Sequence, residues 1–310
     1  MGAQRALDGG GKAVKPRPAV HPAPPMSPTF LQIIVLGLIQ GAAELLPVSS
    51  SAHVIVAEKM MGLDPSHPEM TFLLVMLHTG TMFAVIAYFW RAWRENFFGR
   101  VPRLRETIRQ VAVATVCTLA VGGILKLLIE KIILGGGKAE FEQLFSSLPL
   151  IAGALAAAGA LILIAAARAP RDSGRNDLTL RDSAWIGAVQ ASIVIRGFTR
   201  SGTTISTALL RGVGRRRAEE FSFALGVVIT PPAIALEAWR LFKSHGGTAG
   251  PAHLGQMLLP GLVGMVASFL AGLLALRWLS RWLEAGRWQY FGYYCLGAAA
   301  VVAVLARRGF

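Results

Sequence analysis

Charged residues are scarce in this chain, and their scarcity excludes an ordinary soluble domain. Asp, Glu, Lys and Arg make up 15% of the 310 residues, and hydrophobic residues make up 54%. A soluble domain carries about 25% charged residues, and a membrane-spanning helix needs roughly 20 apolar ones. Six runs meet that length, so we expect an all-α polytopic membrane protein with spans near 71–90, 107–129, 148–167, 218–239, 255–276 and 289–306.

Cysteine and acidic residues are scarce as well. Cys117 and Cys295 lie in separate apolar runs, and their spacing fits neither a disulfide framework nor a zinc motif. Seventeen acidic residues face 31 Lys and Arg, which gives a net charge of +14. The arginines gather in short segments between the apolar runs, where the positive-inside rule and anionic lipids account for them. The charge therefore indicates no nucleic-acid partner.

The N-terminal residues 1–28 lack any apolar period. They are rich in Gly, Pro and basic residues, which predicts a disordered tail. No apolar stretch with a small-residue cleavage site follows the basic start, so a signal peptide is not expected. The periodic sequence begins directly after Met26, which makes Met26 an alternative start. Residues 29–306 are expected to form a single integral-membrane domain.

Two apolar segments are interrupted by polar clusters. The first reads QGAAELLPVSSSAH (40–53) and the second QASIVIRGFTRSGTT (190–204). They lie 150 positions apart, and in the same register Gly37 corresponds to Gly187. Interrupted segments at corresponding positions of two halves point to a binding site where the halves meet.

We expect two inverted repeats, about 29–167 and 183–306. Each would hold a re-entrant pair of short helices and three transmembrane helices, with the irregular backbone buried in protein. Pro47 ends the first short helix, and the serines after it supply a helix N-cap. Three crossings per half is an odd number, so the halves are predicted to be inverted. Arginine counts orient the connections: 91–109, 168–182, 211–217 and 277–288 are expected to be cytoplasmic, and 63–70 and 130–147 to lie outside.

Each break places a helix N-terminus inside the protein, where free N–H groups and the helix dipole favour an anion. Two such ends facing each other suit a diphosphate. The alternative is that the Ser and Thr hydroxyls only cap the short helices, and the sequence does not decide between the two. The candidate substrate-binding residues are Gln40, Ser49, Ser51, Thr199, Ser201, Gly202, Thr203 and Thr204.

Glu44 is an ionisable residue in a membrane segment, and such residues usually face a cavity or a partner. One interpretation is a ligand for a hard divalent cation, Mg²⁺ or Ca²⁺. Gln40, one helical turn earlier, would complete that shell or donate to phosphate. The alternative is an ion pair with Arg200 that holds the halves together. Arg200 itself offers a bidentate fork for phosphoryl oxygens.

His53 follows Ser50 by three residues and Ser49 by four, so its imidazole is expected beside those hydroxyls. That arrangement suits a base that activates a hydroxyl or water, or an acid that protonates a leaving oxygen. The candidate catalytic set is Glu44, Ser50, His53 and Arg200, and the group that attacks phosphorus stays open. His78 is interpreted as a packed or hydrogen-bonded membrane histidine.

QGAAELLPVSSSAH and RGFTRSGTTIS, together with EFSF at 220–223, resemble the signature regions of the undecaprenyl-diphosphatase (bacitracin-resistance) family over about residues 29–306. The resemblance implies removal of one phosphate from undecaprenyl diphosphate, the polyprenyl carrier lipid of cell-wall synthesis. It also implies a divalent cation and a multi-pass protein of the bacterial inner membrane. The family's acidic positions fall on Gln40, where many members have Glu, and on Glu44. Its serine, histidine and arginine fall on Ser50, His53 and Arg200.

Arg196 departs from the family pattern, which has Pro before Gly197. Arg196 could alter the turn or add a second phosphate contact, and Thr199 keeps the hydroxyl of the usual Ser.

The rival reading is a polyprenyl-phosphate transporter or flippase, because inverted repeats with broken helices are also transporter architecture. A carrier needs charge recognition but no adjacent base and hydroxyl, so the Glu/Ser/His/Arg set favours a phosphatase. The acid-phosphatase-like lipid phosphatases fit poorly, since no second histidine lies near Arg200 in the sequence. The sequence leaves the oligomeric state open, with a homodimer as one alternative.

Overall fold

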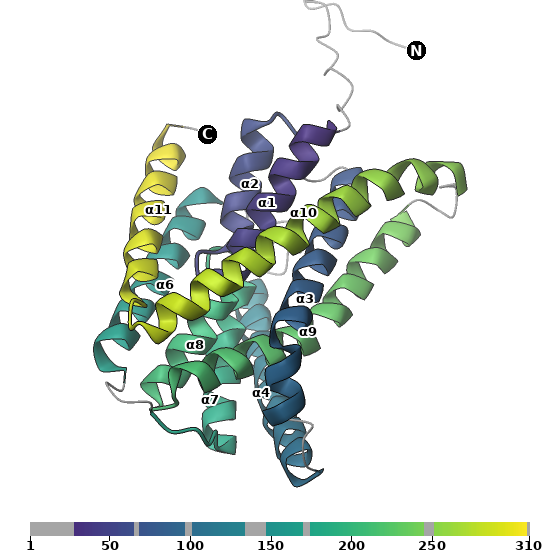
Figure 1. Cartoon of the computed structure of the whole chain (residues 1–310). Coiled ribbons are helices and arrows are strands. Elements are labelled where there is room, and N and C mark those ends of the chain that lie inside the picture. Colours follow the sequence, from purple (N-terminus) through teal and green to yellow (C-terminus); the bar gives the residue numbers. More distant parts are fainter. Residues whose placement is uncertain are drawn as a thin grey trace, which may run out of the picture.

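The computed structural model describes residues 28–64, 68–96, 101–133, 147–169, 174–244 and 251–308. Every named element in these ranges is a helix, which confirms the all-α prediction (Figure 1). The α-helices are α1 Phe30–Leu45, α2 Ser50–Met60, α3 Pro68–Asn96, α4 Val101–Leu128, α6 Leu148–Arg168, α7 Leu180–Gln190, α8 Arg200–Leu210, α9 Arg215–Ser244, α10 Pro251–Glu284 and α11 Gln289–Arg307. Two short turns extend this set, a π-helical one at Ile129–Ile133 and a 3₁₀ one at Ala191–Val194.

Six of these helices are long and apolar enough to cross a membrane, namely α3, α4, α6, α9, α10 and α11. Each contains or closely overlaps one of the six predicted apolar runs, so the polytopic prediction is confirmed. The other four α-helices, α1, α2, α7 and α8, have 11 to 16 residues and are shorter than a span requires. They form the two predicted pairs of short helices.

The connections on the arginine-rich side are shorter than predicted. The expected loop at 91–109 is mostly helical, because α3 continues to Asn96 and α4 begins at Val101. Likewise α10 continues to Glu284, into the expected loop at 277–288. Arginine is a good helix former and its long stem reaches back over apolar surface, so helices extend beyond their apolar runs. The predicted tail and the alternative start at Met26 lie outside the described residues, as do most of the predicted outer loops.

The short helices of the two halves pack in corresponding ways. α1 lies along α10, and α7 lies along α4. In Figure 1 the pair α1 and α2 lies toward the top of the bundle, and α7 and α8 lie toward the bottom. Gly37 of α1 and Gly187 of α7, which correspond in the sequence register, both lie against the neighbouring helix. The packing agrees with a repeat, and the inversion of the halves across the membrane stays a prediction.

Glycine at these contacts allows the helix backbones to approach closely. A Cβ atom at Gly187 would lie 2.1 Å from the backbone oxygen of Ala114 in α4, and one at Gly41 would lie 2.4 Å from the backbone oxygen of Ser268 in α10. Backbone atoms of a packed helix cannot move aside independently of the rest of the helix. These glycines therefore fix how near the short helices sit to the spanning ones.

We expect Gly187→Ala to destabilise the protein by about 1–3 kcal/mol, because the added methyl group overpacks the α4–α7 contact. Thermal unfolding of the purified protein in detergent measures the effect as a lower melting temperature. Gly297→Ala is the matched control, since a Cβ atom there has nothing within 4 Å and alanine is the better helix former. Equal melting temperatures for the two variants would contradict the close packing.

Candidate active site

The two breaks touch each other inside the bundle. A Cβ atom built at Gly202, in the first turn of α8, would lie 3.2 Å from the Cβ atom of Pro47. The carbonyl oxygen of Pro47 also accepts a hydrogen bond from Cys295 Sγ of α11 at 3.1 Å. Segments far apart in the chain therefore meet where the sequence predicted a site.

The first break does not cap its helix in the predicted way. Ser49 precedes α2 but makes no side-chain cap hydrogen bond, and its hydroxyl instead lies 3.3 Å from that of Ser51. The reason is its backbone, with φ at 70°, a left-handed conformation that is uncommon outside glycine. Such strain costs on the order of 1–3 kcal/mol and concentrates at functional sites. The turn directs the Ser49 carbonyl toward α2, where it contacts His53.

The second break is capped as predicted. Thr199 Oγ1 accepts a hydrogen bond from the Gly202 N–H at 3.3 Å and lies 3.3 Å from Ser201 Oγ. The hydroxyls of Thr203 and Thr204 donate to backbone oxygens one turn earlier. The side chains of Ser201, Thr203 and Thr204 are fully buried. These hydroxyls hold the short helix α8 in place, while its first N–H groups point out of its N-terminus as in any α-helix.

Glu44, in the last turn of α1, lies at the centre of a polar cluster. Its Oε2 atom accepts a hydrogen bond from Ser50 Oγ at 2.6 Å and one from Gln40 Nε2 at 3.3 Å. Gln40 is buried, and the Glu44 side chain is 18% exposed. Within the described part of the chain, Glu44 Oε1 makes no hydrogen bond. One carboxylate oxygen is thus held by the protein, and the other is open to a ligand.

Arg200 is fixed by α9. Its Nη1 atom donates to the Ser222 carbonyl at 3.2 Å, and its guanidinium lies over the Phe223 ring, 5.6 Å from the centroid. A Cβ atom at Gly226 would lie 2.4 Å from Nη1, so the guanidinium rests directly on that glycine. The cation–π contact and the carbonyl orient the plane of the guanidinium.

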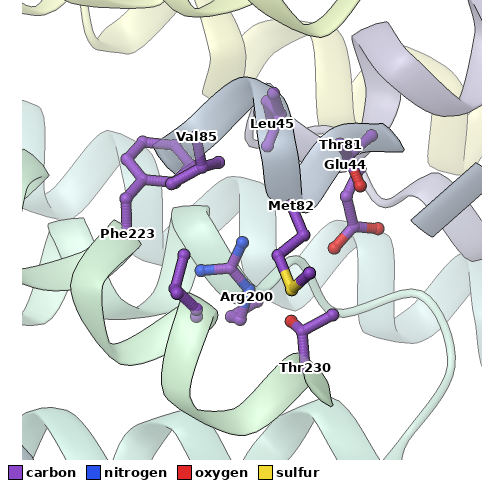
Figure 2. A pocket seen from close by; sticks show the side chains of 10 residues that line it. Glu44, Leu45, Thr81, Met82, Val85, Arg200, Phe223 and Thr230 are labelled. Carbon is purple, nitrogen blue, oxygen red and sulfur yellow. The ribbon is translucent and has the colours of Figure 1, made fainter. Parts of the chain in front are cut away.

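Glu44 and Arg200 line the same pocket, with α3 and α9 supplying its other walls (Figure 2). No ion pair joins these two side chains within the described residues, so the alternative of a direct Glu44–Arg200 pair is wrong. Figure 2 shows the side chain of Met82 between them in the view. The remaining lining residues are Leu45, Thr81, Val85, Phe223, Gly226, Val227 and Thr230.

His53 makes different contacts from those expected. Its Nδ1 donates to the Ser49 carbonyl at 2.8 Å, and its Nε2 lies 2.6 Å from the Tyr294 hydroxyl of α11, against which its ring is stacked. A carbonyl only accepts, so Nδ1 carries the hydrogen, and in the neutral ring Nε2 accepts from Tyr294. The expected pairing of His53 with the Ser50 hydroxyl is wrong, because that hydroxyl bonds to Glu44.

The sequence interpretation missed His78 as a site residue. Its Nδ1 donates to the Leu74 carbonyl at 2.9 Å, as expected of a membrane histidine, but its Nε2 lies 3.7 Å from Glu44 Oε2. Tyr294 was missed as the partner of His53. The only signal for His78 was an ionisable residue within an apolar run, since no local motif marks it.

The donor set fits a cation that is shared with a substrate. The described residues contain no group of three or more His, Cys, Asp or Glu side chains that could hold a metal ion. Mg²⁺ is commonly bound by one or two carboxylates together with substrate phosphates and waters. Glu44, with the amide of Gln40 and the hydroxyl of Ser50 beside it, suits that mode.

The chain matches the family described as bacitracin resistance protein BacA over residues 33–301. It is 53% identical over 281 residues to Undecaprenyl-diphosphatase 2 of Acinetobacter baylyi, covering 89% of this chain and 98% of that protein. It is 34% identical to an undecaprenyl-diphosphatase of Moorella thermoacetica, over 90% of this chain and 99% of the relative. Undecaprenyl-diphosphatase 2 of Burkholderia thailandensis is 33% identical, over 85% of this chain and 92% of that protein.

These matches cover both breaks and confirm the resemblance stated from the sequence motifs. Together with the six helices that are able to span, they identify a multi-pass protein of the bacterial inner membrane. The chain belongs to the BacA family of bacitracin resistance proteins.

Proposed function

We propose that the chain hydrolyses undecaprenyl diphosphate to undecaprenyl phosphate and inorganic phosphate. This reaction recycles the carrier lipid of cell-wall synthesis and gives resistance to bacitracin. The observation that carries the proposal is the pocket where the two breaks meet, with the Glu44 carboxylate on one side and the Arg200 guanidinium on the other. The names of the relatives support the same reaction.

The diphosphate would bind between the two breaks. Arg200 offers planar donors to phosphoryl oxygens, and the N-terminus of α8 adds the Ser201 amide and the positive end of the helix dipole. The Gly202 N–H bonds to Thr199 Oγ1, and the Thr203 N–H bonds to the Thr199 carbonyl. The Thr204 hydroxyl bonds to Ser222 of α9. These four residues, Thr199, Gly202, Thr203 and Thr204, would therefore hold the N-terminus of α8 in position for the substrate. On the first break, Ser49 and Ser51 would shape the turn that delivers Ser50.

Glu44 Oε1 is the atom that would hold the divalent cation, Mg²⁺ or Ca²⁺, with the Gln40 amide as a further oxygen donor. When bound, such a cation neutralises charge on the diphosphate and polarises its oxygens. The phosphate oxygens would complete its shell, consistent with a single protein carboxylate at the site.

Glu44 Oε2 would take a proton from Ser50, and the hydrogen bond of 2.6 Å from that hydroxyl supports this role. That hydroxyl, or a water oriented by the same pair, would attack the terminal phosphorus as its proton moves to the carboxylate. The bond from that phosphorus to the bridging oxygen would break, and undecaprenyl phosphate would leave. Where Ser50 attacks, a water would then cleave the phosphoserine to release inorganic phosphate and restore the hydroxyl. His53 would act through position, since it binds the Ser49 carbonyl and so holds the strained turn next to Ser50. All the residues of the proposed site come from one chain, and a homodimer stays a prediction.

Phosphate release distinguishes this function from a polyprenyl-phosphate flippase. Purified protein in detergent micelles, given undecaprenyl diphosphate and Mg²⁺ or Ca²⁺, is expected to release inorganic phosphate. A micelle has no second leaflet, so this release cannot come from lipid transport. Proteoliposomes with labelled undecaprenyl phosphate provide the parallel assay. Lipid movement between leaflets, with no phosphate release in either system, would favour the flippase.

Tyr294→Phe is expected to slow phosphate release by about 2–10-fold, the worth of one hydrogen bond. The stacked ring stays, and only the hydroxyl that His53 Nε2 contacts is lost. Initial rates with the lipid substrate measure the effect, and Tyr293→Phe, at an exposed neighbouring tyrosine, is the control. A loss beyond about 10²-fold would mean that the Tyr294 hydroxyl acts on the substrate directly.

A further inference from the structure

We propose that His78 Nε2 and the Glu44 carboxylate are two ligands of one divalent cation, so that the site has mixed nitrogen and oxygen donors. The proposal deepens the proposed function and rests on it. His78 comes from α3 and Glu44 from α1, so the cation would also join these two helices at the pocket.

The orientation of His78 is fixed by its own helix. The Leu74 carbonyl accepts from Nδ1 at 2.9 Å, so Nδ1 carries the hydrogen and Nε2 of the neutral ring has a lone pair. A metal-bound histidine usually donates its other ring N–H to a carbonyl or carboxylate in this way, which sets its tautomer. The His78 ring is therefore prepared to ligate through Nε2.

The separation from Glu44 fits two ligands of one ion. His78 Nε2 and Glu44 Oε2 lie 3.7 Å apart, which is too long for a hydrogen bond, and a charged imidazolium donating to a carboxylate would close to about 2.8 Å. The imidazole nitrogen and the carboxylate are therefore near enough to ligate one ion, with Glu44 binding through Oε1, because Oε2 already accepts hydrogen bonds from Ser50 and Gln40.

The surroundings leave room for further ligands from a substrate. The two side chains are 30% and 18% exposed, and Glu44 lines the pocket that Arg200 shares. Imidazole suits ions such as Zn²⁺, Fe²⁺ and Ni²⁺, whereas Ca²⁺ is bound by oxygen ligands. The donor set therefore points to a site that binds a transition ion better than Ca²⁺, and Mn²⁺ serves as the spectroscopic probe of that site.

The test measures binding of Mn²⁺ alone to the purified full-length protein in detergent, with electron paramagnetic resonance reporting free Mn²⁺. His78→Phe is expected to raise the dissociation constant by at least about 10–100-fold, the cost typical of losing even an outer partner of a ligand. Bound Mn²⁺ should show electron spin echo modulation from an imidazole ¹⁴N nucleus. The modulation should vanish in His78→Phe and His78→Gln and persist in His53→Gln, the matched control.

Unchanged affinity and a retained nitrogen signal in His78→Phe would overturn the proposal. A wild-type protein that binds no Mn²⁺ at millimolar concentration would overturn it too. The melting temperature of each variant shows that it is folded, and His78→Gln keeps a polar side chain in case the phenylalanine variant does not fold. Phosphate release by the wild type with Mg²⁺ is measured separately, so a failure here with that activity intact removes His78 from the site and leaves the proposed function standing.

Discussion

Arg200→Ala is expected to reduce phosphate release by about 10²–10³-fold, the cost typical of removing one preorganised group that stabilises developing charge. Arg200 is the cation of the pocket that faces Glu44, and its plane is set by Phe223 and the Ser222 carbonyl. Arg200→Lys should also lose most of the activity, because an ammonium group is a point charge that cannot offer two parallel donors. Initial rates with undecaprenyl diphosphate and excess Mg²⁺ measure both effects.

Arg91→Ala is the matched control for this change. Arg91 also lies on a helix next to a carboxylate, but it forms a surface ion pair with Glu95 and its side chain is 87% exposed. Such pairs contribute about 0–1 kcal/mol, so the control should keep wild-type turnover. Arg200→Ala within threefold of the wild type would place the phosphate elsewhere.

Glu44→Gln and Ser50→Ala are each expected to slow phosphate release by about 10²–10⁴-fold, as for loss of a group that takes part in proton transfer. The two side chains share one hydrogen bond at 2.6 Å. Groups that act as a unit are strongly non-additive, so the double variant should lose little more than the worse single one. Glu95→Gln, at the exposed end of α3, controls for loss of a charge.

His53 provides the contrast to this pair. Its nitrogens contact the Ser49 carbonyl and the Tyr294 hydroxyl, so His53→Ala should cost less than Ser50→Ala. It should cost little more in the Ser50→Ala background, because the turn that His53 holds then carries no hydroxyl. The three single variants and two double variants form two cycles that are measured in the same assay. A loss in His53→Ala as large as in Ser50→Ala, together with multiplied effects in the Glu44–Ser50 cycle, would mean that the imidazole, not the carboxylate, moves the proton.

The periodic and compositional features of the fold could be predicted from the sequence. The six spans are long apolar runs, and the two pairs of short helices are marked by polar clusters and by Pro47. Glu44 and Arg200 stood out because a charge within an apolar segment is costly and usually faces a cavity. The structure brings both to one pocket, although their roles stay proposals.

The contacts between helices could not be predicted in the same way. His78 meets Glu44, and Tyr294 meets His53, through tertiary packing, and no local spacing encodes either pair. Helical spacing correctly placed His53 near the serines, but it did not show that the Ser50 hydroxyl would turn to Glu44. The prediction of a side-chain cap at Ser49 was wrong. Serine is preferred at N-cap positions, but that preference does not predict the left-handed backbone that Ser49 adopts.

The most direct test of the account is phosphate release from undecaprenyl diphosphate by three purified proteins measured side by side. These are the wild type, the pocket variant Glu44→Gln with Arg200→Ala, and the surface variant Arg91→Ala with Glu95→Gln. The account predicts that the wild type and the surface variant each release one phosphate per lipid, and that the folded pocket variant releases none above background. Wild-type rates from the pocket variant, or no release from the wild type with Mg²⁺, Ca²⁺ or Mn²⁺, would contradict it.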